Sequence, residues 1–153
     1  MDIRLAHQGD IPSLLALLLQ VGQVHHDIRP DIFPAGMQKY DAAALLSLLL
    51  DEARPIYVAV ADGAVQGYCF CVVKTMQAGA TQRQEFYIDD LCVDENHRRQ
   101  GIAQALYRHA LEQARSRGCH SLTLNVWCGN EGAQQFYEKM GMTPRNIMME
   151  TKL

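Results

Sequence analysis

The chain has 153 residues, a length that suits one domain with a real hydrophobic core and is short for two. Hydrophobic residues make up 48% and charged residues 20%, and the formal net charge is −3. Counterion release on nucleic acid needs a strong basic surplus, so this balance argues against nonspecific nucleic-acid binding. The most apolar run, residues 14–19, is too short to span a membrane, and the first ten residues lack the apolar stretch of a signal peptide.

The five cysteines give no sign of a disulfide framework or a zinc site. Their number is odd, and no two of them have the Cys-x-x-Cys spacing of a zinc knuckle. We expect buried, reduced thiols of a cytosolic protein. A nucleophilic cysteine is the alternative, and Cys92 is its best candidate, although it lacks an obvious histidine partner nearby in the sequence. A metal site would need more ligands at a coherent spacing than the sequence offers, so no metal is expected.

The first half of the chain predicts two helices and a hairpin. Asp10 before Ile11-Pro12 is suited to begin a helix, and apolar residues then recur at helical spacing. Asp62-Gly63 is typical of a two-residue hairpin turn. The elements expected are, in order, a strand over 2–6, a helix from 11, a loop or broken helix over 25–36, a helix over 38–52 and strands over 56–61 and 65–75.

The second half alternates strands and helices. A polar, flexible connection is expected over 77–84, followed by a strand over 85–93, a helix over 101–117, a strand over 121–127, a helix over 130–140 and a closing strand over 142–152. The predicted order is therefore β-α-α-β-β-β-α-β-α-β. Because a hairpin comes first and a β-α-β unit follows, we expect an α/β domain with a mixed central sheet flanked by helices on both faces.

The turn between the strand ending at Val93 and the helix after Gly101 has the residues of a phosphate site. The first N–H groups of a helix lack intrahelical partners and lie at the positive end of the helix dipole. Gly101 has no Cβ to keep phosphate oxygens away from the backbone, and Arg98 and Arg99 add charged donors. Taken alone, the pattern also fits a surface strand–helix turn.

The particular pattern is Arg98-x-x-Gly101-x-Ala103, which lacks the lysine of a Walker A loop and the three glycines of a dinucleotide fingerprint. It resembles the coenzyme A binding motif of the GCN5-related N-acetyltransferase superfamily. A second segment is similar to the other signature of that superfamily, Asn-x-x-Ala-x-x-Phe-Tyr-x-x-x-Gly-Phe. It matches at Asn130, Ala133, Phe136, Tyr137 and Gly141, with Met142 in place of the last Phe.

The resemblance implies a single N-acetyltransferase domain over 1–153 with acetyl-CoA as its cosubstrate. It implies that the strand before the turn pairs with pantetheine, that the turn holds the pyrophosphate, and that Asn130 contacts the pantetheine arm. The residues implied to bind the cosubstrate are Leu91, Cys92, Val93, Arg98, Arg99, Gln100, Gly101, Ile102, Ala103, Gln104 and Asn130. It also implies that Tyr137 donates a proton to the departing thiolate, although an aromatic residue at that position could simply pack in the core.

Direct attack on a thioester needs a neutral amine, so a base is required. Asp89 and Asp90 are the candidates, and neighbouring strand residues point to opposite faces unless a bulge intervenes. In members of the superfamily with an acidic base, the acid of a similar strand aligns with Asp89, which we prefer, acting directly or through a water. A carboxylate with a structural or solvated role is the alternative.

The acceptor is expected to be a small-molecule or peptide amine, and the sequence does not identify it. The resemblance places the region between the first two helices at the acceptor site, which makes His25 and His26 candidates, with Asn125 and Trp127 from the later strand. A homodimer is possible through the closing strand. Two other functions stay open: a regulatory module that binds CoA with little turnover, and a protein-interaction domain that does not bind CoA.

Overall fold

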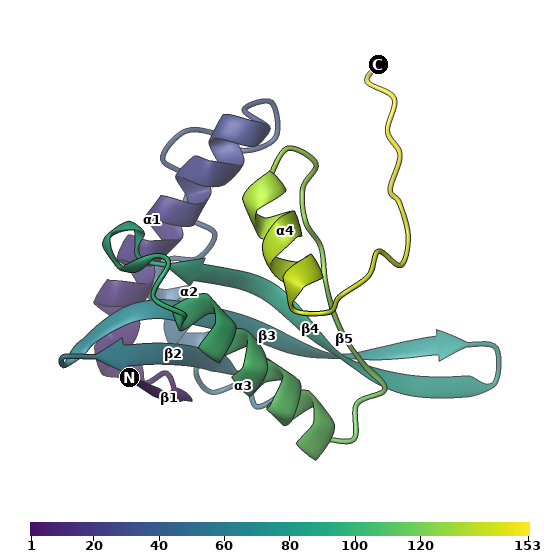
Figure 1. Ribbon diagram of the computed structural model, residues 1–153, viewed down its shortest axis with the longest axis horizontal. Helices are drawn as coiled ribbons and strands as arrows, with labels where there is room; N and C mark the ends of the chain where they lie inside the picture. Colours follow the sequence, from purple (N-terminus) through teal and green to yellow (C-terminus); the bar gives the residue numbers. More distant parts are fainter.

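The computed structural model describes all 153 residues, the side chain of Ala78 excepted. Five strands form one sheet in the order β1-β2-β3-β4-β5, and helices cover both of its faces (Figure 1). The elements are β1 (Asp2–Leu5), the short 3-10 turn η1 (Gln8–Asp10), α1 (Ile11–Ile28), α2 (Ala42–Leu48), β2 (Ile56–Ala61), β3 (Ala64–Ala78), β4 (Thr81–Val93), the 3-10 turn η2 (Glu95–His97), α3 (Ile102–Ser116), β5 (Ser121–Leu124) and α4 (Glu131–Lys139).

The sheet is mixed, as the sequence predicts. Strands β1 to β4 pair antiparallel, whereas β4 and β5 are joined through α3 and pair parallel. Because strand side chains alternate between faces, each strand contributes to two cores. Residues such as Val58 and Tyr68 pack against α1 and α2, while Ala59 and Cys69 pack with α3. The predicted α/β class with helices on both faces is therefore confirmed.

The hairpin between β2 and β3 turns at Asp62-Gly63. Asp62 has φ 51° and Gly63 has φ 75°, and Ala61 pairs with Ala64 across the turn. Positive φ at both central residues is the requirement of a type I′ hairpin turn, which Asp-Gly meets at low cost. The prediction from this dipeptide is confirmed.

Several predicted boundaries differ from the structure, among them the end of the strand predicted over 121–127, since β5 stops at Leu124. Helix α1 continues through the start of the predicted loop, so both His25 and His26 lie on its last turn. Helix α2 is shorter than predicted because Asp41 caps it: the Ala44 amide donates to Asp41 Oδ1 at 2.8 Å. Residues 77–84 are not a flexible connection, because β3 and β4 extend as a paired arm that projects from the body (Figure 1).

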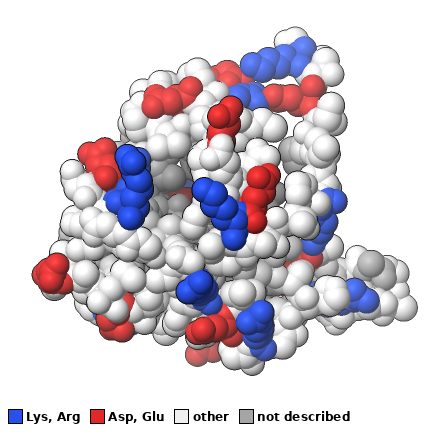
Figure 2. All heavy atoms as spheres, in the orientation of Figure 1, with Lys and Arg blue, Asp and Glu red and all other residues white. Residues whose placement is uncertain are grey.

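The predicted closing strand is wrong. Residues 142–153 have no strand pairing and run as an extended tail that leaves α4 at Gly141 (Figure 1). Side-chain ion pairs hold this tail instead of a backbone ladder: Arg145 bonds to Glu85 on β4, and Glu150 lies 2.5 Å from Arg29 at the end of α1. Acidic and basic side chains accordingly lie together at the top of the face shown in Figure 2. The possible homodimer stays a prediction.

Helix α1 is preceded by a buried carboxylate whose loss should measurably destabilise the fold. Asp10, 5% exposed, accepts bonds from Arg4 at 2.7 and 2.9 Å and from the His7 amide at 2.9 Å. The Arg4 guanidinium holds the pKa of Asp10 below its usual value, although burial opposes this. The ionised form is therefore preferred in the folded state, and its stabilisation is lost as pH falls through the lowered pKa.

We expect Asp10→Asn to lower the free energy of unfolding at pH 7 by about 2 kcal/mol, since bonds to a charged group are stronger than neutral ones. Urea unfolding of both proteins at several pH values would measure this. The difference in the free energy of unfolding between the two proteins should have its full size above about pH 4, the pKa of an unperturbed Asp, and should decrease below that pH. The exposed Asp27→Asn is the control. A difference that persists unchanged at acid pH would contradict the ion-pair explanation.

Candidate active site

The start of α3 presents its backbone amides outward. Gly101 caps the helix with φ 82°, and across residues 98–104, all of which are described, no side chain bonds to the first turn. The space where a Gly101 Cβ would lie is open. Arg99, two residues earlier, also has a positive φ of 61°, an uncommon conformation for a residue other than glycine. The turn thus keeps the helix amides available for an anion.

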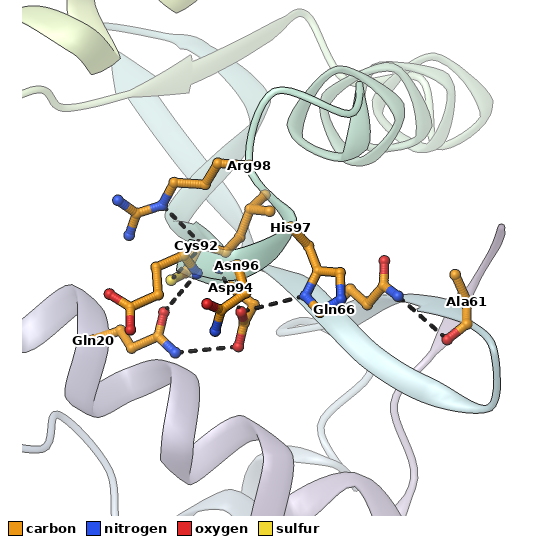
Figure 3. A network of polar contacts seen from close by, with 10 residues as sticks. Gln20, Ala61, Gln66, Cys92, Asp94, Asn96, His97 and Arg98 are labelled. Carbon is orange, nitrogen blue, oxygen red and sulfur yellow. Dashed lines mark hydrogen bonds and ion pairs between the residues drawn. The ribbon is translucent and has the colours of Figure 1, made fainter.

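The turn is held in place from both sides (Figure 3). Asp94 caps η2 by accepting from the Asn96 amide at 2.8 Å, which lowers the pKa of that carboxyl. Gln20 on α1 reaches across, donating to Asp94 Oδ2 at 3.2 Å and accepting from the Glu95 amide at 3.0 Å. A hollow of about 420 Å³ lies between α1 and the turn, and Arg98 is on its wall.

The predicted cosubstrate residues occupy distinct places around this turn. Arg98, Arg99 and Gln100 are exposed, and Arg98 Nε donates to the Val93 carbonyl at 3.3 Å. Ala103 and Gln104 are half-buried in the first turn. Ile102 is 2% exposed and packs in the core, so its part in any site is limited to its amide. Gly67 on β3 lets α3 approach, since a Cβ there would lie 3.2 Å from Ile102 Cγ2.

Strands β4 and β5 separate next to the turn. Their parallel pairing covers only 85–88 with 121–124, while β4 continues to Val93. In the described chain, no strand pairs with residues 89–93 of β4 on the side toward β5. Leu91 and Val93, which the resemblance assigns to pantetheine, lie on this unpaired edge. An extended ligand can therefore add to β4 as a strand would.

A β-bulge in β4 positions the two candidate acids. Asp90 pairs with Phe70 and Ile88 with Cys71, so Asp89 is the extra residue. Asp90 therefore lies on the face toward α1 and α2, where Tyr68 Oη donates to it at 2.8 Å. Asp89 also reaches that side and accepts from Lys39 at 2.6 Å and Tyr40 at 3.3 Å. Both acids thus share one side, as a bulge allows.

The environments of the two acids differ. Burial raises the pKa of Asp90, although the Tyr68 hydroxyl stabilises its charged form. The side chain of Asp89 is 20% exposed and forms an ion pair with Lys39. The residues that hold these acids, Lys39, Tyr40 and Tyr68, carry no signal in the sequence, because they meet β4 only through the packing of other elements.

Helix α4 is capped at both ends. Asn130 Oδ1 accepts from the Ala133 amide at 3.2 Å, so this oxygen serves the helix start. At the other end Gly141 has φ 88°, and the amides of Gly141 and Met142 donate to the carbonyls of Glu138 and Tyr137 in a Schellman motif. These caps fix the rotation of α4 and therefore the direction of Tyr137.

Tyr137 is part of an aromatic cluster on the α3 side of the sheet. Its ring lies 5.0 Å from Phe136 and 6.2 Å from Tyr107. Burial, followed by the charges of Cys69 and Asp90, raises the pKa of Tyr137. The phenol therefore remains protonated near neutral pH. Of the two β4 acids, Asp90 contributes to this rise.

The candidate acceptor residues come from the end of α1 and from the segment after β5. His25 stacks on Phe33 at 5.0 Å, and Phe33 meets Trp127 edge-on at 5.2 Å. His26 Nδ1 lies 2.7 Å from the Phe33 carbonyl, so this ring braces the loop after α1. Asn125, which is exposed, donates to the Tyr87 hydroxyl at 3.1 Å. The structure thus brings His25 and Trp127 together through Phe33, whereas Asn125 lies beside Tyr87.

The cysteine alternative is disfavoured by the position of Cys92. It is 6% exposed, its sulfur faces the Leu17 carbonyl at 3.6 Å, and burial raises its pKa to about 12. A thiol of that kind stays protonated and is a poor nucleophile. In the described chain no group of three or more His, Cys, Asp or Glu side chains is placed to hold a metal ion, and none of its helices is long and apolar enough to cross a bilayer.

A helix tip whose first amides lack side-chain partners can bind an anion, and the strand edge beside it, which opens where β5 diverges, can pair with an extended chain. A profile of the acetyltransferase (GNAT) family matches residues 20–142. The chain therefore belongs to this family.

Curated relatives and solved structures agree with this membership. The chain is 38% identical over 77 residues to GCN5-related N-acetyltransferase 6, chloroplastic, of Arabidopsis thaliana, and 36% identical over 90 residues to streptothricin acetyltransferase of Streptomyces lavendulae. These alignments cover 50% and 59% of the chain, but only 25% and 44% of the relatives. The chain thus spans less than half the length of these two proteins.

Among solved structures, a mutant of the BH1408 protein from Bacillus halodurans superposes with a TM-score of 0.94 at 26% identity, covering 100% of this chain and 99% of the other. An aminoglycoside N-acetyltransferase in complex with CoA superposes with a TM-score of 0.71 at 15% identity, covering 99% and 100%. The second likeness shows a shared fold.

Proposed function

We propose that the chain is an acetyl-CoA dependent N-acetyltransferase that moves the acetyl group to a primary amine by direct attack in a ternary complex. The observation that carries this is the uncapped start of α3 beside the unpaired edge of β4. Amides at the helix tip suit a pyrophosphate, and the open strand edge suits the amide-containing pantetheine arm. Family membership supplies the reaction class.

In this proposal each cosubstrate-binding residue has a defined task. The amides from Arg99 to Gln104 hold the pyrophosphate, and the Arg98 guanidinium adds charge from the wall of the hollow beside α1. The backbone of Leu91 and Val93 pairs with pantetheine, which requires Arg98 Nε to release the Val93 carbonyl. The amide near Cys92 or Val93 polarises the thioester carbonyl. Asn130 contacts the pantetheine arm through its side-chain nitrogen Nδ2, since its side-chain oxygen Oδ1 caps α4.

Tyr137 acts as the general acid. A thiol has a pKa of about 8.5 and a phenol one of about 10, and burial raises that of Tyr137 further. Full proton transfer to the thiolate is therefore uphill, and the hydroxyl stabilises the developing charge chiefly as a hydrogen-bond donor. The same high pKa keeps the donor protonated over the working range.

Asp89, directly or through a water, takes the proton of the attacking amine. It lies on the α1 side of β4, is partly exposed, and already holds an ammonium group, that of Lys39, at 2.6 Å. Asp90, whose carboxylate accepts from the Tyr68 hydroxyl at 2.8 Å, is the alternative base. His25, His26 and Asn125 are assigned, as before, to the acceptor side.

The base assignment predicts a pH-dependent loss. Asp89→Asn should lower kcat/KM by about 10² at neutral pH, the lower end of what a positioned general base contributes. Without the base, only the fraction of amine that is already neutral reacts. The loss should therefore shrink as pH rises toward the pKa of the acceptor, which is about 10.4 for a lysine-type amine. Rates measured from pH 6 to pH 10 would test this.

Asp90→Asn is the matched comparison, since it preserves shape and can still accept from Tyr68. We expect a smaller loss of kcat/KM from this variant. A larger loss from Asp90→Asn than from Asp89→Asn would transfer the role of base to Asp90.

The competing function is a regulatory module that binds CoA with little turnover. Thiol release from acetyl-CoA should be followed with a panel of small amines and of peptides with free amino groups. Acceleration by at least one amine supports the enzyme. Tight CoA binding, measured by calorimetry, without acceleration by any amine would favour the module, and thermal unfolding unmoved by CoA would favour a domain that does not bind it.

A further inference from the structure

The loop between α1 and α2 places a primary amine on the proposed base. Lys39 Nζ lies 2.6 Å from Asp89 Oδ2, although the two residues are 50 positions apart in the sequence. The ammonium also lies 5.6 Å from the centre of the Tyr40 ring, which stacks on Phe70 of β3 at 5.7 Å. The Lys39 ammonium thus lies at the bulge of β4, although its side chain is partly exposed to solvent.

The Lys39 ammonium and the Tyr40 hydroxyl meet on one oxygen of Asp89. The Lys39 side chain is 40% exposed, and the Tyr40 hydroxyl shares the same carboxylate oxygen, which fixes where the nitrogen lies. The other three lysines, which are exposed as Lys39 is, lie elsewhere: Lys74 over the Tyr87 ring, Lys139 at the end of α4, and Lys152 beside Asp31. Only the Lys39 amine is held by the residue proposed to activate acceptors, among the four lysines described.

We propose that Lys39 is itself an acetyl acceptor and that the chain acetylates this residue from acetyl-CoA. This rests on the proposed function. The Lys39 amine passes its proton to Asp89 and attacks the thioester carbonyl carbon; the new C–N bond forms as the C–S bond breaks. The nitrogen, once bonded to the acetyl carbon, loses its surplus proton to the departing sulfur, whose negative charge the Tyr137 hydroxyl stabilises by a hydrogen bond. The products are therefore acetyl-lysine and the CoA thiol, and Asp89 returns the first proton to solvent.

Acetylation changes the site electrostatically. An acetylated Lys39 carries no charge, so the ion pair with Asp89 is lost. Asp89 Oδ2 then retains the Tyr40 hydroxyl and is open to the ammonium group of an external acceptor. The same geometry therefore identifies the acceptor class as a primary aliphatic amine that approaches Asp89 along the path of Lys39.

The test uses the full chain and acetyl-CoA with no added amine, followed by intact mass and peptide mapping over time. We expect Lys39 to be acetylated at least about tenfold faster than each of the other three lysines, because a held amine reacts at a high effective concentration. The first-order rate constant should not depend on protein concentration. Tyr137→Phe should slow the modification of Lys39 without slowing that of the others.

Lys39→Arg is the matched control, since it retains the ion pair and cannot form acetyl-lysine, and its intact mass should stay nearly unchanged. Similar rates at all four lysines, the same rates in urea, or a rate that rises with protein concentration would overturn the inference. An unmodified Lys39 in a chain that acetylates an external amine would overturn the inference and leave the proposed function standing. Absence of CoA binding would overturn both.

Discussion

Gly101→Glu is expected to abolish acetyl-CoA binding, with a rise in Kd of about 10³ or more, equivalent to about 4 kcal/mol. Two effects combine. Gly101 has φ 82°, a conformation that costs a side-chain-bearing residue about 1 kcal/mol or more. The added carboxylate would also lie in the open space beside the helix amides, where it competes with and repels the pyrophosphate. Calorimetric titration with CoA measures the change.

Gly118→Glu is the control that distinguishes damage to the binding site from the cost of placing a side chain at a positive φ. Gly118 follows the other end of α3, also has a positive φ, 68°, and also has open space where a Cβ would be. Both variants should lose comparable stability, but only Gly101→Glu should lose CoA. Gly101→Asn, which tolerates the left-handed conformation and adds no charge, should bind with an intermediate Kd. Unchanged affinity in Gly101→Glu would remove the helix tip from the binding site.

Tyr137→Phe is expected to lower kcat by about 10² while leaving KM for acetyl-CoA nearly unchanged, since one hydroxyl that acts on the leaving group is removed. The acid must be protonated to work, and burial raises its pKa. The wild-type activity should therefore show no descending limb attributable to this residue below about pH 10, the pKa of an unperturbed phenol. Steady-state kinetics with an amine identified in the panel measures both quantities.

Tyr107→Phe is the control, because Tyr107 belongs to the same aromatic cluster and is 5% exposed on α3. It should retain kcat, and both variants should unfold at similar urea concentrations. Equal kcat in wild type and Tyr137→Phe would reduce Tyr137 to a packing residue, the alternative that the sequence left open.

The acceptor side shows where sequence reasoning stopped. The place of His26 between the first two helices predicts an acceptor contact, which stays a prediction, and the structure adds that its ring lies on the Phe33 carbonyl in the loop after α1. Lys39 was not singled out, because a single lysine in a loop has no recognisable pattern. The two acids of β4 were expected on opposite faces unless a bulge intervened, and the bulge at Asp89 decided the matter.

The sequence by itself determined the features that depend on short-range chemistry. Gly101 and Gly141 adopt positive φ, Asn130 and Asp94 cap the turns that follow them, and Asp62-Gly63 closes a hairpin, because each involves residues a few positions apart. The tertiary structure alone decided the contacts between Lys39 and Asp89 and between Gln20 and Asp94, which span 50 and 74 positions. It also decided that the tail is held by ion pairs in place of a strand. Such contacts depend on how helices settle on the sheet, which is fixed by the packing of the whole core and not by any local pattern.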